Sequence, residues 1–125
     1  MFKYNADFEP PAPCLDILVS HPEIAETSRT LSFQLDTGSD ITVLPLHIIT
    51  ELALPRAGEI LIEGYDTIQD QATIYFATLS IKNFIFRRVS VLAVERTQGL
   101  LGRDVLNLLV ANLNGPKLQF DLTTK

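Results

Sequence analysis

Apolar and polar residues alternate with a period of two in several separate parts of the amino-acid sequence. The alternation is clearest at residues 15–19, 31–35 and 117–122. Successive side chains of a β-strand point to opposite faces of a sheet, so this spacing is typical of strands that bury one face. Residues 60–81 and 84–95 add stretches rich in β-branched and aromatic residues that suit paired strands. The sequence therefore predicts an all-β fold, mostly β with one or two short helices.

The helices are expected at two places. Residues 46–54 follow Pro45, which suits the first turn of a helix, and they end before Pro55, which cannot continue one. Residues 100–114 are interpreted as the end of a strand, a turn and a short helix near Asp104.

The N-terminal residues differ from the rest of the chain. Residues 1–13 contain Pro10, Pro11 and Pro13, and prolines fix φ and remove backbone donors. We interpret residues 1–13 as an extended, proline-rich N-terminal arm. We interpret residues 14–125 as a single domain, because a chain of 125 residues has the length of one domain.

Composition excludes several classes of protein. Hydrophobic residues make up 46% and charged residues 20% of the chain, as in an ordinary globular domain. The net charge of −5 disfavours nucleic acid as a partner, and no run approaches the ~20 apolar residues that span a bilayer. Cys14 is the single cysteine, and no cysteine and histidine cluster has metal-ligand spacing. We expect a cytoplasmic protein with no membrane partner, no metal and no cofactor.

A polar turn interrupts the apolar pattern within FQLDTGSDITVLP, residues 33–45. Asp36 follows an apolar strand directly, and an ionised carboxylate is costly to bury unless it is hydrogen-bonded. Gly38 allows backbone N–H groups to approach closely, and Thr37 and Ser39 supply further donors. We interpret this stretch as a strand followed by a turn that holds an ionised carboxylate.

Two motifs carry a resemblance to a known family. LDTGSD, residues 35–40, followed by Thr42-Val43-Leu44, resembles the active-site segment of retropepsin-like aspartic proteases. Downstream, LLGRDVL, residues 100–106, resembles the second signature of that family at the expected distance. The proline-rich opening is similar to that of small bacterial single-domain members, so the resemblance covers nearly the whole chain. It implies a retropepsin-like acid-protease barrel that forms a homodimer, with the active site at the two-fold interface.

The chemistry explains why such a chain would pair with itself. Peptide hydrolysis by this route needs two carboxyls around one water, one as base and one as acid. The chain has one Asp-Thr-Gly, and Asp40 belongs to the same tight turn and would point elsewhere, so the second carboxyl is expected from Asp36 of another copy. The pair should titrate as a unit and favour activity on the acidic side. The resemblance thus implies an aspartic endopeptidase that hydrolyses peptide or protein substrates.

The resemblance also implies roles for neighbouring residues. Thr37 would hydrogen-bond across the two-fold axis, while Gly38, through its carbonyl, and Asp40 would contact the substrate backbone. Arg103 would pair with Asp40, since a guanidinium presents a planar fork to a carboxylate.

The hairpin around Gly64 matches the flap that closes over substrate in this family. Gly64 and Tyr65 are therefore assigned to substrate binding. This flap departs from the family pattern, because relatives often carry several glycines where residues 64–67 keep one.

Further expectations concern the pocket walls and the terminal strand. Leu44, Ile62 and Leu100 flank the motifs and are interpreted as apolar pocket walls. Residues 117–125 are similar to the terminal strand that joins the dimer sheet in this family, although a strand paired only within its own chain is the alternative.

Other functions fit the sequence less well. Actin-like and sugar-kinase ATPases need further glycine-rich phosphate turns, and 6 glycines leave no second such loop. Gly38 stands where a phosphatase-type Asp-x-Asp motif needs its second acid, and a bilobed pepsin-like enzyme needs a second lobe. The remaining alternative is a non-catalytic peptide-binding dimer on the same fold.

Overall fold

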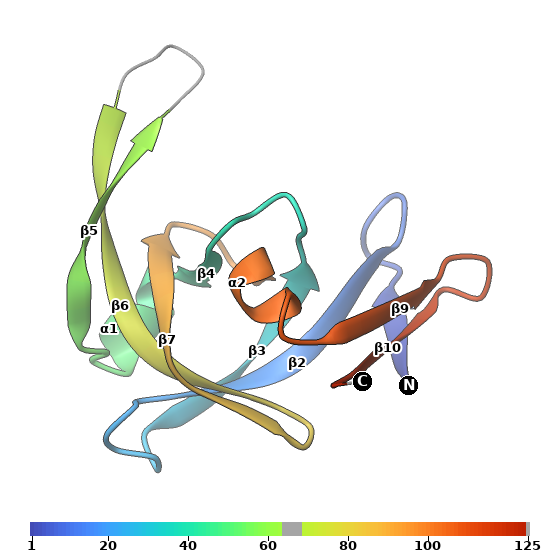
Figure 1. Cartoon of the computed structure of the whole chain (residues 1–125), viewed down its shortest axis with the longest axis horizontal. Coiled ribbons are helices and arrows are strands. Elements are labelled where there is room, and N and C mark those ends of the chain that lie inside the picture. The colour runs from blue at the N-terminus through green and yellow to red at the C-terminus, as the bar shows by residue number, and fades with distance from the viewer. Residues whose placement is uncertain (64–68, 125) are drawn as a thin grey trace.

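The computed structural model describes residues 1–63 and 69–124, with only the backbone given for residues 62–63 and 69–71. Gly64 and Tyr65, the expected flap residues, lie outside the described residues. The described chain forms the following elements, shown in Figure 1: β1 (Phe2–Asn5), β2 (Ala12–Ser20), β3 (Ser28–Leu35), β4 (Thr42–Pro45), α1 (Leu46–Glu51), β5 (Arg56–Glu63), β6 (Gln69–Ile81), β7 (Phe84–Val94), β8 (Gly99–Leu101), α2 (Arg103–Leu106), β9 (Val110–Asn114) and β10 (Gln119–Thr123). The prediction of a mostly β fold with two short helices is confirmed.

The strands join in one strongly curved sheet. Their order is β5-β6-β7-β4-β8-β3-β2-β1-β10-β9, with an additional pairing between β6 and β2. Most neighbours are antiparallel, but β3 pairs with β8 and β4 pairs with β7 in parallel. The hairpin of β5 and β6 extends away from the body of the molecule (Figure 1). The parallel pairs matter for function, because they bring residues 33–45 beside residues 91–101.

The alternating pattern of the sequence places the core. In β2 the side chains of Ile17 and Val19 are fully buried, whereas Asp16 is exposed and Leu18 is 39% exposed. Phe33 of β3 is also fully buried. Burying apolar surface contributes roughly 25 cal/mol per Å², so this face accounts for much of the stability of the sheet.

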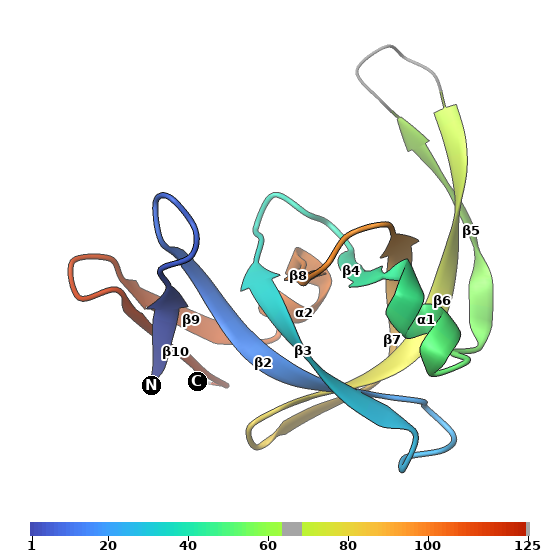
Figure 2. The same ribbon diagram turned by 180° about the vertical axis from the view of Figure 1, so that it is seen from behind.

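The helices lie where the sequence predicts them and are shorter than expected. α1 follows Pro45, buries Ile48 and Ile49, and packs against β4 and β7 (Figure 2). α2 has four residues and packs against β4. No helix among the described residues is long and apolar enough to cross a membrane.

Residues 2–5 form β1, and turns and bends at residues 6–10 lead into β2, so this segment belongs to the same sheet as the rest of the chain and is not extended throughout. β1 pairs with β10 on one side and with β2 on the other. The ring of Phe2 stacks on that of Phe120 with 5.0 Å between their centroids. β2 already begins at Ala12, so the structure has no boundary between an arm and a domain at residue 13.

Candidate active site

The Asp36–Asp40 turn connects β3 to β4 and is tied to the neighbouring strand by backbone hydrogen bonds. The N–H of Asp36 donates to the carbonyl of Leu101 at 3.0 Å, which continues the parallel pairing of β3 with β8. The N–H of Ser39 donates to the carbonyl of Asp36 at 3.1 Å and closes the turn. The hydroxyl of Ser39 donates to the carbonyl of Ile41 at 2.6 Å. Both backbone groups of Asp36, its N–H and its carbonyl, are therefore hydrogen-bonded.

The carboxylate of Asp36 is oriented by the turn itself. The N–H of Gly38 donates to its Oδ1 at 3.0 Å, and the side chain is half-buried. A Cβ at Gly38 would lie 3.2 Å from the same oxygen, tighter than usual for such a contact. Glycine thus lets the amide approach the carboxylate, as the sequence predicted. No donor among the described residues contacts Oδ2, which leaves that oxygen available.

The second motif, at Gly102 and Arg103, packs directly against this turn. A Cβ at Gly102 would lie 2.7 Å from the backbone carbon of Ile41, so no larger residue fits without a shift of the main chain. The N–H of Arg103 donates to the carbonyl of Ser39 at 2.8 Å. The two motifs, more than 60 residues apart in the sequence, form one unit.

The guanidinium of Arg103 has a different partner from the one expected. Its Nη1 donates to the carbonyl of Thr37 at 2.6 Å. No ion pair between Arg103 and Asp40 forms in the described part of the chain, and Asp40 is exposed. The expected pair is therefore wrong for the single chain. The physical reason is that the Arg103 backbone is fixed at Ser39, and from there its side chain reaches the Thr37 carbonyl. Arg103 still braces the turn, through a carbonyl instead of a carboxylate.

The structure shows a contact between Thr42 and Asp104 that the sequence does not predict. Asp104 accepts the Thr42 N–H at 3.1 Å on Oδ2 and the Thr42 hydroxyl at 2.7 Å on Oδ1. The same hydroxyl oxygen accepts the N–H of Gly102 at 3.1 Å. Thr42 and Gly102 are buried, so the N–H and hydroxyl of Thr42 and the N–H of Gly102 each need a partner. The available signal was a threonine inside the apolar run 41–44, together with an acid in the first turn of α2.

The expected pocket walls are only partly supported. Leu44 is 0% exposed and belongs to the core, so it cannot contact a substrate. Its position in β4 between β7 and β8 explains this burial. Leu100 is half-buried beside Val43, and the side chain of Ile62 lies outside the described residues.

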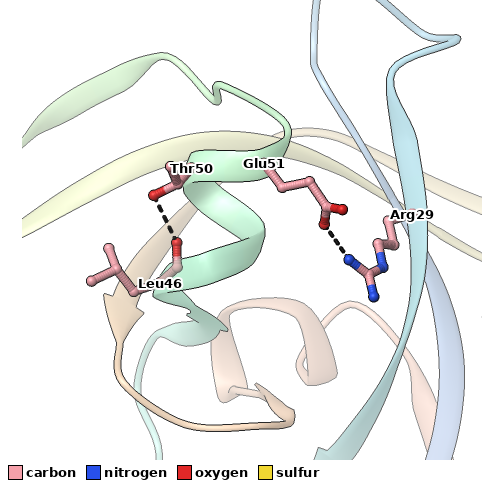
Figure 3. A network of polar contacts seen from close by, with 4 residues as sticks. All are labelled: Arg29, Leu46, Thr50 and Glu51. Carbon is pink, nitrogen blue, oxygen red and sulfur yellow. Dashed lines mark hydrogen bonds and ion pairs between the residues drawn. The ribbon is translucent and has the colours of Figure 1, made fainter.

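A hollow of about 820 Å³ lies beside α1, away from this turn. Its lining includes Arg29, Thr50 and Glu51, and no residue of the Asp36–Asp40 turn. Figure 3 shows its polar groups contacting each other: Arg29 pairs with Glu51, and the Thr50 hydroxyl donates to the Leu46 carbonyl at 3.2 Å. The candidate active site is therefore not this hollow.

Other reactive side chains do not gather near Asp36. Cys14 is buried, and burial raises the pKa of its thiol. Nδ1 of His21 accepts the N–H groups of Glu23 at 3.0 Å and Ile24 at 3.2 Å, which orders the loop between β2 and β3. No group of three or more metal-ligating side chains occurs among the described residues.

Solved structures resemble this chain over 74% to 98% of its length. A retropepsin-like aspartic protease from Rickettsia conorii aligns with a TM-score of 0.64 and 14% identity, covering 98% of this chain and 88% of that one. The EIAV protease in complex with the inhibitor HBY-793 aligns with a TM-score of 0.56 and 22% identity, covering 77% of this chain and 86% of that one. The simian foamy virus (mac) protease aligns with a TM-score of 0.54 and 18% identity, covering 74% of this chain and 92% of that one. The fold is therefore retropepsin-like.

The family follows from the sequence comparison. The aspartyl protease family matches residues 23–105, which contain the Asp36 turn and the Gly102 motif. The chain belongs to this family, and the resemblance noted in its sequence is confirmed. A comparison with curated proteins found no match.

Proposed function

We propose that the protein is a homodimeric aspartic endopeptidase in which Asp36 of each copy supplies one carboxyl of the catalytic pair. The observation that carries this proposal is the Asp36 turn. The Gly38 N–H donates to the carboxylate Oδ1 at 3.0 Å, the Asp36 backbone N–H donates to the Leu101 carbonyl at 3.0 Å, and Oδ2 has no donor among the described residues. Membership of the aspartyl protease family supports the same chemistry.

The proposed reaction uses a water molecule held between the two carboxyls. One carboxylate removes a proton from the water as its oxygen attacks the peptide carbonyl carbon, and the other carboxyl donates its proton to the carbonyl oxygen. The tetrahedral intermediate collapses when the C–N bond breaks: the amine nitrogen takes a proton from one carboxyl, and a hydroxyl of the intermediate returns a proton to the other carboxylate. A single chain holds one such carboxyl in its turn, so a second copy is required.

The neighbouring residues position this chemistry. Thr37 and Gly38 are exposed at the turn, where Thr37 can meet the partner turn and the Gly38 carbonyl can accept a substrate N–H. Asp40 is exposed and is proposed to contact the substrate backbone further from the cleaved bond. Arg103 positions the turn through the Thr37 carbonyl. Gly64 and Tyr65 are proposed to close over the bound peptide, a role that rests on the sequence resemblance.

The extended peptide is the substrate class that this arrangement suits. Exposed backbone groups at the turn, such as the Gly38 carbonyl, can hold a chain in β geometry through main-chain hydrogen bonds. The proposed reaction needs no metal or cofactor, because the two carboxyls supply both base and acid.

The test is digestion of a peptide library from about pH 4 to 7, with wild type, Asp36→Asn and Asp16→Asn compared. Asp16 is an exposed acid on β2 and serves as the matched control. We expect wild type and Asp16→Asn to cleave, statine-containing peptides to inhibit, and Asp36→Asn to lose about 10³-fold or more in kcat. Cleavage that survives in Asp36→Asn would overturn the mechanism. Peptide binding by wild type without cleavage would favour the non-catalytic dimer.

A further inference from the structure

The hollow beside α1 is large enough to hold a ligand. It has a volume of about 820 Å³. Pockets that bind small molecules measure roughly 300–1,000 Å³. Leu46 and Thr50 line the hollow from α1, Arg29 lines it from β3, and residues 95–97 line it from the end of β7 and the connection to β8. Three separate parts of the chain thus surround one space outside the Asp36 site.

The polar groups of Arg29 and α1 are largely satisfied within the chain. Arg29 forms an ion pair with Glu51 (Figure 3). The Thr50 hydroxyl donates to the Leu46 carbonyl. The side chain of Leu46 is 41% exposed and contributes apolar surface to the hollow. This side of the hollow therefore offers a ligand an apolar surface next to a neutralised ion pair.

The connection from β7 to β8 carries two charges that are free to bind a ligand. Glu95 is exposed and makes no hydrogen bond or ion pair with any described residue. Nε of Arg96 donates to the Gln98 carbonyl at 2.7 Å, while its Nη groups have no acceptor in the described part of the chain. The side chains of Thr97 and His47, which also line the hollow, have no hydrogen-bond partner among these residues either. One anion and one cation are therefore available at the same hollow.

The chemistry of these groups selects a dipolar ligand. A carboxylate pairs with an ammonium group, and a guanidinium pairs with a carboxylate through charge-assisted hydrogen bonds. A short peptide with free ends carries an α-ammonium, an α-carboxylate and side chains between them. It therefore matches Glu95, Arg96 and the apolar surface of Leu46 together.

We propose that this hollow is a second peptide site, which binds a short peptide by its free ends, the α-ammonium at Glu95 and the α-carboxylate at Arg96. The source of the ligand rests on the proposed function, because hydrolysis of a peptide bond leaves one new carboxylate and one new ammonium group. A fragment that is cut at both ends carries both groups. The ligand of the second peptide site is thus a product of the proposed enzyme.

Two strands connect the second peptide site to the Asp36 turn. α1 follows β4 directly, and Gln98 alone separates Thr97 from β8. β4 pairs with β8, and the carbonyl of Leu101 in β8 accepts the Asp36 N–H at 3.0 Å. A peptide that contacts both α1 and residues 95–97 links the two segments that continue these strands. Because the unfolded chain has no such hollow, binding stabilises the folded state by mass action.

The first test measures the binding of the dipeptide Ala-Leu to the wild-type protein by calorimetry. N-acetyl-Ala-Leu lacks the ammonium group, and Ala-Leu amide lacks the carboxylate. We expect each blocked form to bind about fivefold more weakly than Ala-Leu, since each loses one ion pair. Equal binding of the three peptides, or no binding of Ala-Leu at about 10 mM, would overturn the proposal.

The second test assigns the two ends of the peptide. In Glu95→Gln the affinities of Ala-Leu and its N-acetyl form should become equal, and in Arg96→Met those of Ala-Leu and its amide should become equal. Glu26→Gln and Arg87→Met, at exposed positions outside the hollow, are the matched controls and should keep the wild-type differences. Circular dichroism checks that the variants fold. Differences that survive in folded Glu95→Gln and Arg96→Met would contradict the proposal, and the blocked peptides decide on wild type alone if a variant does not fold.

Competition separates the second peptide site from the active site. A statine-containing peptide should leave the binding of Ala-Leu unchanged, whereas displacement of Ala-Leu would place it in the catalytic site and overturn the proposal. If Ala-Leu binds as expected and wild type cleaves nothing, the second peptide site stands and the proposed function fails. If wild type cleaves peptides through Asp36 and Ala-Leu does not bind, the proposed function stands and the second peptide site fails.

Discussion

Thr42 and Asp104 join the strand after the active-site turn to the helix of the second motif through two hydrogen bonds. Thr42 gives its backbone N–H at 3.1 Å and its hydroxyl hydrogen at 2.7 Å to the two carboxylate oxygens. Because the Thr42 hydroxyl also accepts the N–H of Gly102, one buried side chain connects β4, Gly102 and α2. The precision of the Asp36 turn depends on this connection as well as on the turn itself.

Replacing Thr42 by valine is expected to destabilise the fold. The substitution keeps the shape of the side chain but leaves the N–H of Gly102 without an acceptor and Asp104 Oδ1 with one donor fewer. Leaving a buried polar group unpaired costs about 1–3 kcal/mol. Urea unfolding measures the loss. Thr50→Val is the control, since Thr50 is exposed and donates only to the Leu46 carbonyl at 3.2 Å. Equal stability of the two variants would show that the Thr42 network is not important.

Gly102→Ala should be more harmful than the same change at an open glycine. The new Cβ would meet the Ile41 backbone at 2.7 Å, and overpacking of this kind costs about 1–3 kcal/mol. Gly115→Ala provides the control, because no atom lies within 4 Å of a Cβ built there. Thermal unfolding and peptide cleavage are the measurements. Normal activity in Gly102→Ala would contradict the close packing of the two motifs.

Arg103→Met is expected to lower kcat about tenfold and to change KM little, because the Thr37 carbonyl loses its donor and the turn becomes less well positioned. The backbone bond from Arg103 to Ser39 remains, so the variant should fold. Arg87→Met, at an exposed position on β7, is the control. An unchanged kcat in Arg103→Met would remove the positioning role.

The thiol of Cys14 should be unreactive in the folded protein. It is 7% exposed, and burial raises its pKa, so little thiolate is accessible. The sign of the pH effect follows from linkage. The folded state holds the thiol proton more tightly, so stability is kept below the ordinary thiol pKa and falls as the pH rises past it. Titration with a disulfide reagent in buffer and in urea is the measurement, and rapid reaction in buffer would contradict the burial.

The active-site turn could be predicted because its signals are local. Alternation locates β3, and the Asp36-Thr37-Gly38 order after an apolar strand already implies a carboxylate that accepts a backbone N–H. The structure confirms this with the bond from Gly38 to Oδ1. Local sequence was sufficient here because the residues involved are two positions apart.

The remaining contacts depend on residues that are distant in the sequence. The threonine inside the apolar run 41–44 does not identify Asp104 as its partner, because the antiparallel pairing of β4 with β8 that brings α2 beside Thr42 is a property of the whole sheet. The prediction that Arg103 pairs with Asp40 is wrong because this contact, too, depends on how distant parts of the chain pack. Charge complementarity favoured Asp40, whereas the backbone position of Arg103 directs its side chain to Thr37.

The sequence does not predict β9, because its local pattern suits a helix as well as a strand. Residues 105–114 were interpreted with the helix near Asp104, since their closely spaced leucines suit a helix as well as a strand. The antiparallel pairing of Val110–Asn114 with Gln119–Thr123 shows that residues 110–114 form a strand.

The central claim, that one catalytic pair takes its two carboxyls from two chains, is tested most directly by mixing subunits. Wild type and Asp36→Asn are unfolded together, refolded at a fixed total concentration, and assayed for peptide cleavage as the wild-type fraction varies. If both chains supply a carboxyl, activity follows the square of that fraction and falls to about a quarter in an equal mixture. Activity that falls only to about half, in direct proportion to the wild-type fraction, would contradict the shared pair.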